Sequence, residues 1–145
     1  MSGNRRQSDH WTKKAKAAGY SARSVYKLEE IQRRERLLPK KGNVVDLGCC
    51  PGSWSQYLHR KGGRITLVGV DISETPGYPG TFLQGSALTI EPQRILDALD
   101  GQRATLVMSD MAPKTEGHRF TDHIRQVELA RAALRIACLL YTSPS

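Results

Sequence analysis

At 145 residues, with 39% hydrophobic residues, the chain is long enough for one domain and too short for two. It has no apolar run near the roughly 20 residues that a membrane-spanning helix needs, and its first residues lack the apolar segment of a secretory signal. The formal net charge is +8, and it is unevenly placed: residues 1–41 carry 12 Lys and Arg against 4 Asp and Glu, whereas residues 42–145 carry 10 of each. This distribution predicts that residues 5–41 contact a polyanion, with nucleic acid the favoured class.

The three cysteines, Cys49, Cys50 and Cys138, do not form a metal-binding or disulfide pattern. Two are adjacent, the count is odd and no Cys-x-x-Cys occurs, so neither a disulfide framework nor a zinc site is expected. We interpret Cys49 and Cys50 as small buried thiols beside a glycine-containing loop. Free thiols are typical of a reducing compartment, which favours a cytoplasmic location.

The first predicted segment, residues 1–20, is polar and basic. It is interpreted as an arm or as a short leading helix over residues 11–18, and its aromatic residues, Trp11 and Tyr20, stand among lysines and arginines. Cations with scattered aromatics are typical of a surface that follows phosphates and stacks on bases.

A helix is predicted over residues 22–38, with Ser21 as its N-cap. Apolar residues recur near helical spacing in this segment, at Val25, Leu28, Ile31 and Leu38. Lys27 lies off this stripe, so the local pattern alone predicts a solvent-exposed lysine there.

From residue 43 onward, apolar β-branched runs alternate with helical segments. Strands are predicted over residues 43–48, 64–71, 81–84 and 104–110, and helices over residues 53–61, 91–100 and 122–137. The second run is apolar almost throughout, as expected of a strand buried on both faces. Strand followed by helix, repeated along the chain, predicts a parallel α/β sheet.

A glycine-containing loop, Asp46-x-Gly48-x-x-x-Gly52, follows the first predicted strand. It lacks both the G-x-G-x-x-G pattern of dinucleotide sites and the Gly-Lys-Ser/Thr of phosphate-binding loops. Asp71 ends the second strand 23 positions after Gly48, where an acid accepts hydrogen bonds from ribose hydroxyls. A nucleoside without a phosphate fits this combination, and S-adenosylmethionine is the predicted ligand.

Four segments in the same order resemble the FtsJ/RrmJ family of ribosomal RNA large-subunit methyltransferases, which act on a ribose 2′-hydroxyl. The segments are Ser21-Ala22-Arg23-Ser24-Val25-Tyr26-Lys27-Leu28-Glu29-Glu30-Ile31, Val45-Asp46-Leu47-Gly48-Cys49-Cys50-Pro51-Gly52-Ser53-Trp54-Ser55-Gln56, Phe82-Leu83-Gln84-Gly85 and Met108-Ser109-Asp110-Met111-Ala112-Pro113. The resemblance implies a Rossmann-like methyltransferase fold dependent on S-adenosylmethionine. It would have a parallel sheet with helices on both faces, truncated after the fourth strand and its following helix.

The resemblance also implies which residues form the site. A Lys–Asp–Lys–Glu catalytic tetrad places its first lysine on Lys27 and its aspartate on Asp110. Cofactor contacts are implied at Gly52, Trp54, Asp71 and Asp110. Ser86 stands where the family has an acid that contacts the adenine, so a hydrogen bond can persist there without the charge. No metal is implied.

The second lysine and the glutamate of the tetrad would follow the helix over residues 122–137, and this sequence stops at Ser145. We therefore expect a basic arm at 1–20, a partial methyltransferase domain at 21–137 and a non-native tail at 138–145. The tail does not match the turn and apolar strand expected there, and we interpret it as a translated adapter sequence. The chain as written is expected to turn over little or not at all.

The resemblance implies ribosomal RNA or the large ribosomal subunit as the partner of residues 5–41, and a uridine of 23S-type RNA as the target. No membrane contact and no obligate oligomer are expected. Transfer RNA as the substrate, or a non-catalytic fragment that binds RNA or cofactor, are the alternatives. A base methyltransferase is disfavoured because Asp110-Met111-Ala112-Pro113 differs from the Asn/Asp-Pro-Pro-Tyr/Phe that amino-group enzymes carry after this strand.

Overall fold

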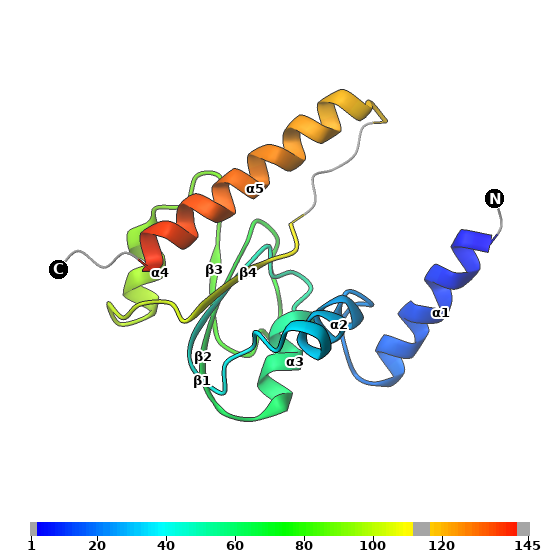
Figure 1. Cartoon of the computed structure of the whole chain (residues 1–145), viewed down its shortest axis with the longest axis horizontal. Helices are drawn as coiled ribbons and strands as arrows, with labels where there is room; N and C mark the ends of the chain where they lie inside the picture. Colours follow the sequence, from blue (N-terminus) through cyan, green and yellow to red (C-terminus); the bar gives the residue numbers. More distant parts are fainter. Residues whose placement is uncertain (1–2, 112–116, 142–145) are drawn as a thin grey trace.

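A sheet of four parallel strands in the order β3-β2-β1-β4 forms the centre of the molecule (Figure 1). Its strands are β1 (Lys41–Leu47), β2 (Arg64–Asp71), β3 (Thr81–Gln84) and β4 (Leu106–Ser109). The computed structural model describes residues 3–111 and 117–141, and of residues 3–8 it describes the backbone alone. The parallel α/β sheet that the alternating elements predicted is confirmed.

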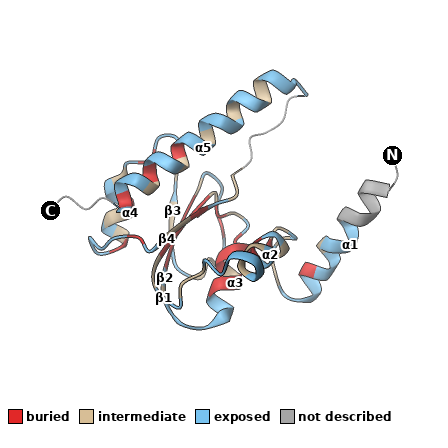
Figure 2. Cartoon of the chain, in the orientation of Figure 1, coloured by how far each residue is buried: buried red, intermediate tan, exposed pale blue. Residues whose placement is uncertain are grey.

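Helices cover both faces of this sheet. Against α4 (Pro92–Ala98) and α5 (Arg119–Tyr141), the strands bury Val45, Leu47, Val68 and Val70. Beneath α2 (Val25–Glu35) and α3 (Ser53–Lys61), they bury Val44, Leu67 and Met108, and Ala15 near the end of α1 (Gly3–Ala17) joins the same core. Successive residues of a strand point to opposite faces, so the near-continuous apolar runs serve two cores, seen as buried segments in Figure 2.

The first two helices differ from their predicted limits. A helix, α1, forms in place of an arm, and it is longer than the leading helix predicted over residues 11–18. Helix α2 begins after Ser24 rather than Ser21, and it ends at Glu35, followed by Arg36 as the C-cap with a left-handed φ of 50°. The Ser21 backbone amide instead donates to the Gln56 side chain (3.0 Å), so Ser21 is tied to α3 and does not cap α2.

Helix α5 extends beyond the predicted range of 122–137 at both ends and reaches Tyr141. Leu140 is buried, its carbonyl accepts from the Ala104 backbone amide (3.4 Å), and the Tyr141 hydroxyl donates to the Thr105 carbonyl (3.0 Å). The described part of the predicted tail is therefore helix that packs beside β4, while residues 142–145 lie outside the described ranges. Neither α5 nor any other helix in the described ranges is long and apolar enough to cross a membrane.

Candidate functional site

The glycine-containing loop turns sharply at the carboxyl end of β1. Gly48 has a φ of +73°, and the amides of Gly48 and Cys49 both donate to the Val70 carbonyl, at 2.7 and 3.1 Å. A Cβ on Gly48 would lie 2.5 Å from the Met111 Cγ, so this glycine is required for space as well as for its backbone conformation. Gly52, at a φ of +104°, directly precedes α3. The loop thus joins β1 to α3 while holding its backbone against β2.

A cavity of about 820 Å³ opens beside this loop, within the size range of small-molecule sites. Its walls come from the carboxyl ends of the strands and from α5. Of the residues predicted for the site, Asp71, Ser86 and Asp110 line it. Arg125 and Glu128 of α5 also line it. They were not predicted, because no local motif marks them and the sequence does not indicate where along that edge the helix after the fourth strand lies.

Asp71 is held in place by the backbone around it. One carboxylate oxygen accepts from the Cys50 amide (2.9 Å) and the other from the Ser73 amide (2.8 Å). Each carboxylate oxygen has two acceptor positions, so both keep capacity for a further donor. A ribose diol offers two such donors, which makes the observed geometry suitable for the role predicted from the position of Asp71.

Lys27 and Asp110 meet at the same edge of the sheet. The Lys27 ammonium donates to an Asp110 carboxylate oxygen at 2.6 Å, although 83 residues separate them in sequence. Their side chains are 62% and 31% exposed, and an ion pair this exposed contributes at most about 1 kcal/mol to stability. The pair therefore contributes little to folding, and its predicted catalytic role stays a prediction.

Trp54 and Gly52 are placed differently from Asp71 and Asp110. Trp54 is 7% exposed, and its indole N–H donates to the Ser24 carbonyl (2.9 Å) at the start of α2. It lines a small cavity of about 40 Å³ together with Asp110, whereas Gly52 lines neither cavity. Trp54 therefore positions the segment that carries Lys27, and its predicted contact with a cofactor stays a prediction, as does that of Gly52.

Asp46 begins the glycine-containing loop pattern, although no role was predicted for its side chain. It lies within β1, is 2% exposed, and its carboxyl accepts from the Ser55 hydroxyl (2.9 Å). The Ser55 hydroxyl in turn contacts the Tyr78 hydroxyl (2.7 Å). Burial raises the pKa of Asp46 to about 7, and the charges of Asp110 and Asp71 also raise it. The available signal was an acid inside an otherwise apolar strand.

Comparisons with known proteins identify the family of the chain. A family model described as FtsJ-like methyltransferase matches residues 20–143. The Ribosomal RNA large subunit methyltransferase E of Granulibacter bethesdensis is 40% identical over 92% of this chain and 58% of its own length. The protein of the same name from Desulfosudis oleivorans is 39% identical over 94% of this chain and 67% of its own length.

A solved structure shares the fold. The crystal structure of a ribosomal RNA methyltransferase from Plasmodium falciparum superposes with a TM-score of 0.78 at 24% identity, covering 85% of this chain and 73% of that one. At this identity the likeness concerns the fold. The chain spans between 52% and 67% of the length of the curated relatives it matches.

Proposed function

Because the chain belongs to the FtsJ-like methyltransferase family, we propose that its parent protein transfers a methyl group from S-adenosylmethionine to a ribose 2′-hydroxyl of large-subunit ribosomal RNA. A uridine is the proposed target. The observation that carries the proposal is the hydrogen bond between Lys27 and Asp110 beside a cavity lined by Asp71. The names of the relatives support the RNA class.

The cavity at the ends of the strands fits the proposed cofactor. Asp71 would accept from the ribose hydroxyls, and Asp110 would hold the amino-acid end, where the ligand carries its ammonium group. The Ser86 hydroxyl accepts from the Leu88 amide (3.1 Å), which leaves its own proton free to be donated to an adenine nitrogen. When bound, S-adenosylmethionine supplies an electrophilic methyl group.

The protein side of the reaction is positioning and the removal of one proton. The attacking 2′-hydroxyl must lose its proton as the new carbon–oxygen bond forms, and a lysine in its neutral form can accept it. Asp110 orients Lys27 through the observed hydrogen bond. The other two tetrad residues of the family have no counterpart in the 145 residues, so we propose that this chain binds cofactor and transfers little or no methyl.

The test uses the complete parent protein and large-subunit RNA from cells that lack the modification. Labelled methyl should enter this RNA and not transfer RNA, and a primer-extension stop should map it to a ribose. Lys27→Ala should lower the rate at least about 100-fold, because general base catalysis contributes that much. Arg103→Ala, an exposed cation at the opposite end of β4 from Asp110, is the control and should leave the rate unchanged. Label found only in transfer RNA would overturn the proposed substrate.

A further inference from the structure

The cation–π contacts found in the described part of the chain all lie on the side of the sheet covered by α1, α2 and α3. The first cluster joins two helices. The Lys14 ammonium lies 5.0 Å from the Trp11 ring centroid and 5.2 Å from that of Tyr26, and the two rings are 5.2 Å apart. Tyr26 directly precedes Lys27 in α2, so the same helix carries one ring of this cluster and the lysine of the Lys27–Asp110 pair.

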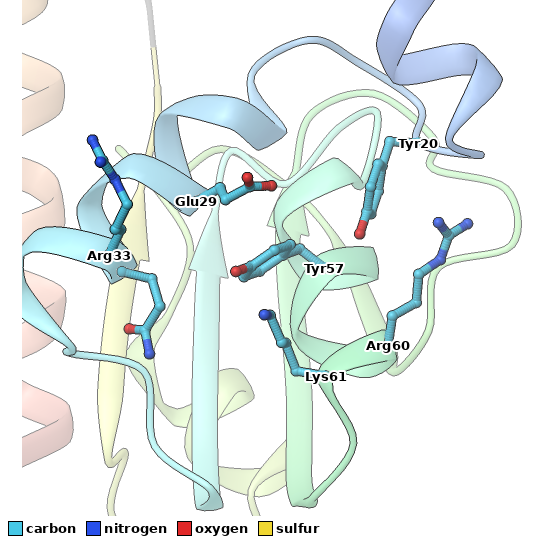
Figure 3. A pocket seen from close by; sticks show the side chains of 7 residues that line it. Tyr20, Glu29, Arg33, Tyr57, Arg60 and Lys61 are labelled. Atoms are coloured by element: carbon cyan, nitrogen blue, oxygen red, sulfur yellow. The ribbon is translucent and has the colours of Figure 1, made fainter.

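A second cluster continues toward the end of α3. Arg60 lies 4.4 Å from the Tyr20 ring, and the Lys61 ammonium lies 5.0 Å from the Tyr57 ring. These four residues line a cavity of about 580 Å³ with Glu29 and Arg33 of α2 (Figure 3). We call the two clusters together the aromatic–cation band.

The aromatic–cation band has more cation–π contacts than are needed to hold α1 in place. Significant cation–π contacts occur about once per 70 to 80 residues, yet this chain gathers four on one side. Helix α1 is already anchored by Ala15, which is fully buried, and by Arg60, which donates to the carbonyls of Ala18 (2.7 Å) and Gly19 (2.6 Å). The Trp11 side chain nevertheless stays 42% exposed, with part of its indole open to a ligand.

The charge of the band suits a polyanion. Its cations Lys14, Arg60 and Lys61 outnumber Glu29, while Arg33 in the cavity wall is paired with Glu30 (2.6 Å). Two of them, Arg60 and Lys61, come from the part of the chain whose net charge is zero, so the sequence distribution of charge did not reveal them. Aromatic rings interleaved with cations bind single strands, because every base has a face for stacking and every nucleotide has a phosphate.

We propose that the aromatic–cation band binds the single-stranded RNA that flanks the target ribose. A base stacks on Trp11, and the backbone phosphates follow Lys14 and then Lys61 away from the Lys27–Asp110 pair. This inference rests on the proposed function for its choice of RNA. It adds that the flanking strand is unpaired and that it crosses from α1 to the end of α3.

The test measures affinity of the 145-residue chain for a labelled single-stranded RNA by fluorescence anisotropy. Trp11→Leu, which keeps an apolar contact with Tyr26, should weaken binding at least about fivefold, since loss of one stacked base costs that much. Phe120→Leu removes another exposed ring, on α5, and should leave affinity within twofold. Equal affinities of the two variants would overturn the stacking site.

The charge of the band is tested independently with Lys14→Gln and Lys61→Gln. Each should reduce the slope of log affinity against log salt by about 0.7, the value per phosphate contact on a single strand. Arg103→Gln, an exposed cation before β4, is the matched control and should leave the slope unchanged. Slopes that all equal that of the unmodified chain would overturn the phosphate track, and tighter binding of a duplex of the same sequence would overturn the unpaired strand.

Calorimetric titration with S-adenosylmethionine separates this inference from the proposed function. The band lies outside the cofactor cavity, so its variants should bind cofactor as the unmodified chain does. If the parent protein bound RNA through the band yet methylated no ribose, the proposed function alone would fail. If it methylated RNA while Trp11→Leu and Lys61→Gln bound RNA normally, the band alone would fail.

Discussion

Asp110 connects the two cavities at the edge of the sheet, because it lines both and also accepts from Lys27. Its partner comes from α2, and the cavity beside it extends to Asp71 on β2. Local sequence patterns could not predict this meeting, because 83 residues separate Lys27 from Asp110. Only the family resemblance paired them, and the contact in the structure is consistent with that pairing.

Replacing Asp110 with asparagine should test whether its negative charge, rather than its size, is needed for cofactor binding. Asp110→Asn keeps the size of the side chain but removes the anion proposed to hold the cofactor's ammonium group. Affinity for S-adenosylmethionine should fall at least about tenfold, because a hydrogen bond to a charged group contributes about 1.5–3 kcal/mol. Calorimetric titration measures this, with Asp97→Asn on α4 as the matched control. Unchanged affinity would remove Asp110 from the proposed site.

Asp46 should make stability depend on pH. Its pKa of about 7 in the fold lies above the ordinary value of 3.8, so the folded state holds a proton that the unfolded state has released between these pH values. Stability should therefore fall as the pH rises from about 4 to about 7, and Asp46→Asn should abolish this fall. Urea unfolding at pH 5 and pH 8 measures the difference, expected to be on the order of a few kcal/mol. Parallel pH profiles for both proteins would contradict the buried, protonated carboxyl.

The predicted bounds of helices and strands agree with the structure where no distant contact shifts the end of the element. Helix α3 and the strands β2 and β3 have their predicted bounds. The start of α2 was wrong because Ser24, not Ser21, precedes the helix, and its hydroxyl contacts Ser53 (2.9 Å) of α3. Helix α5 is longer than predicted because its last turn contacts the segment before β4. In both places a distant contact decided the boundary.

The loop between β1 and α3 offers a test with an internal control. Gly48→Ala would strain a positive φ and press its Cβ against Met111, whereas Gly77→Ala strains a similar φ of +70° with open space around it. In each variant, placing alanine at a positive φ should cost roughly 1 kcal/mol of folding free energy. Gly48→Ala should therefore lower the free energy of unfolding by about 1 kcal/mol more than Gly77→Ala. Urea denaturation of both variants measures it, and equal losses would show that Met111 moves aside freely.

Across the whole molecule, the sheet has an open side at β4. Among the described strands, β4 pairs with β1 alone and forms one edge of the sheet. An edge strand presents unpaired amides and carbonyls that can pair with another chain. The sequence predicted a strand here, and the pairing in the structure places it at the edge of the sheet.

The open edge should make the 145-residue chain self-associate as its concentration rises. Sedimentation velocity over a range of concentrations measures this, and the complete parent protein is the comparison. We expect association for this chain, and less association for a longer protein only if one of its strands pairs with β4. A monomeric short chain throughout the range would show that its edge is protected.

Because Asp110 immediately follows β4, the Lys27–Asp110 contact depends on a strand of four residues held on one side. Short edge elements open locally at lower free-energy cost than the centre of a sheet. Heating should therefore detach the aspartate from the lysine before β1 and β2 separate. The temperature at which this chain loses cofactor binding would then lie below the temperature that melts the sheet, and cofactor affinity on heating would report on one edge of the fold.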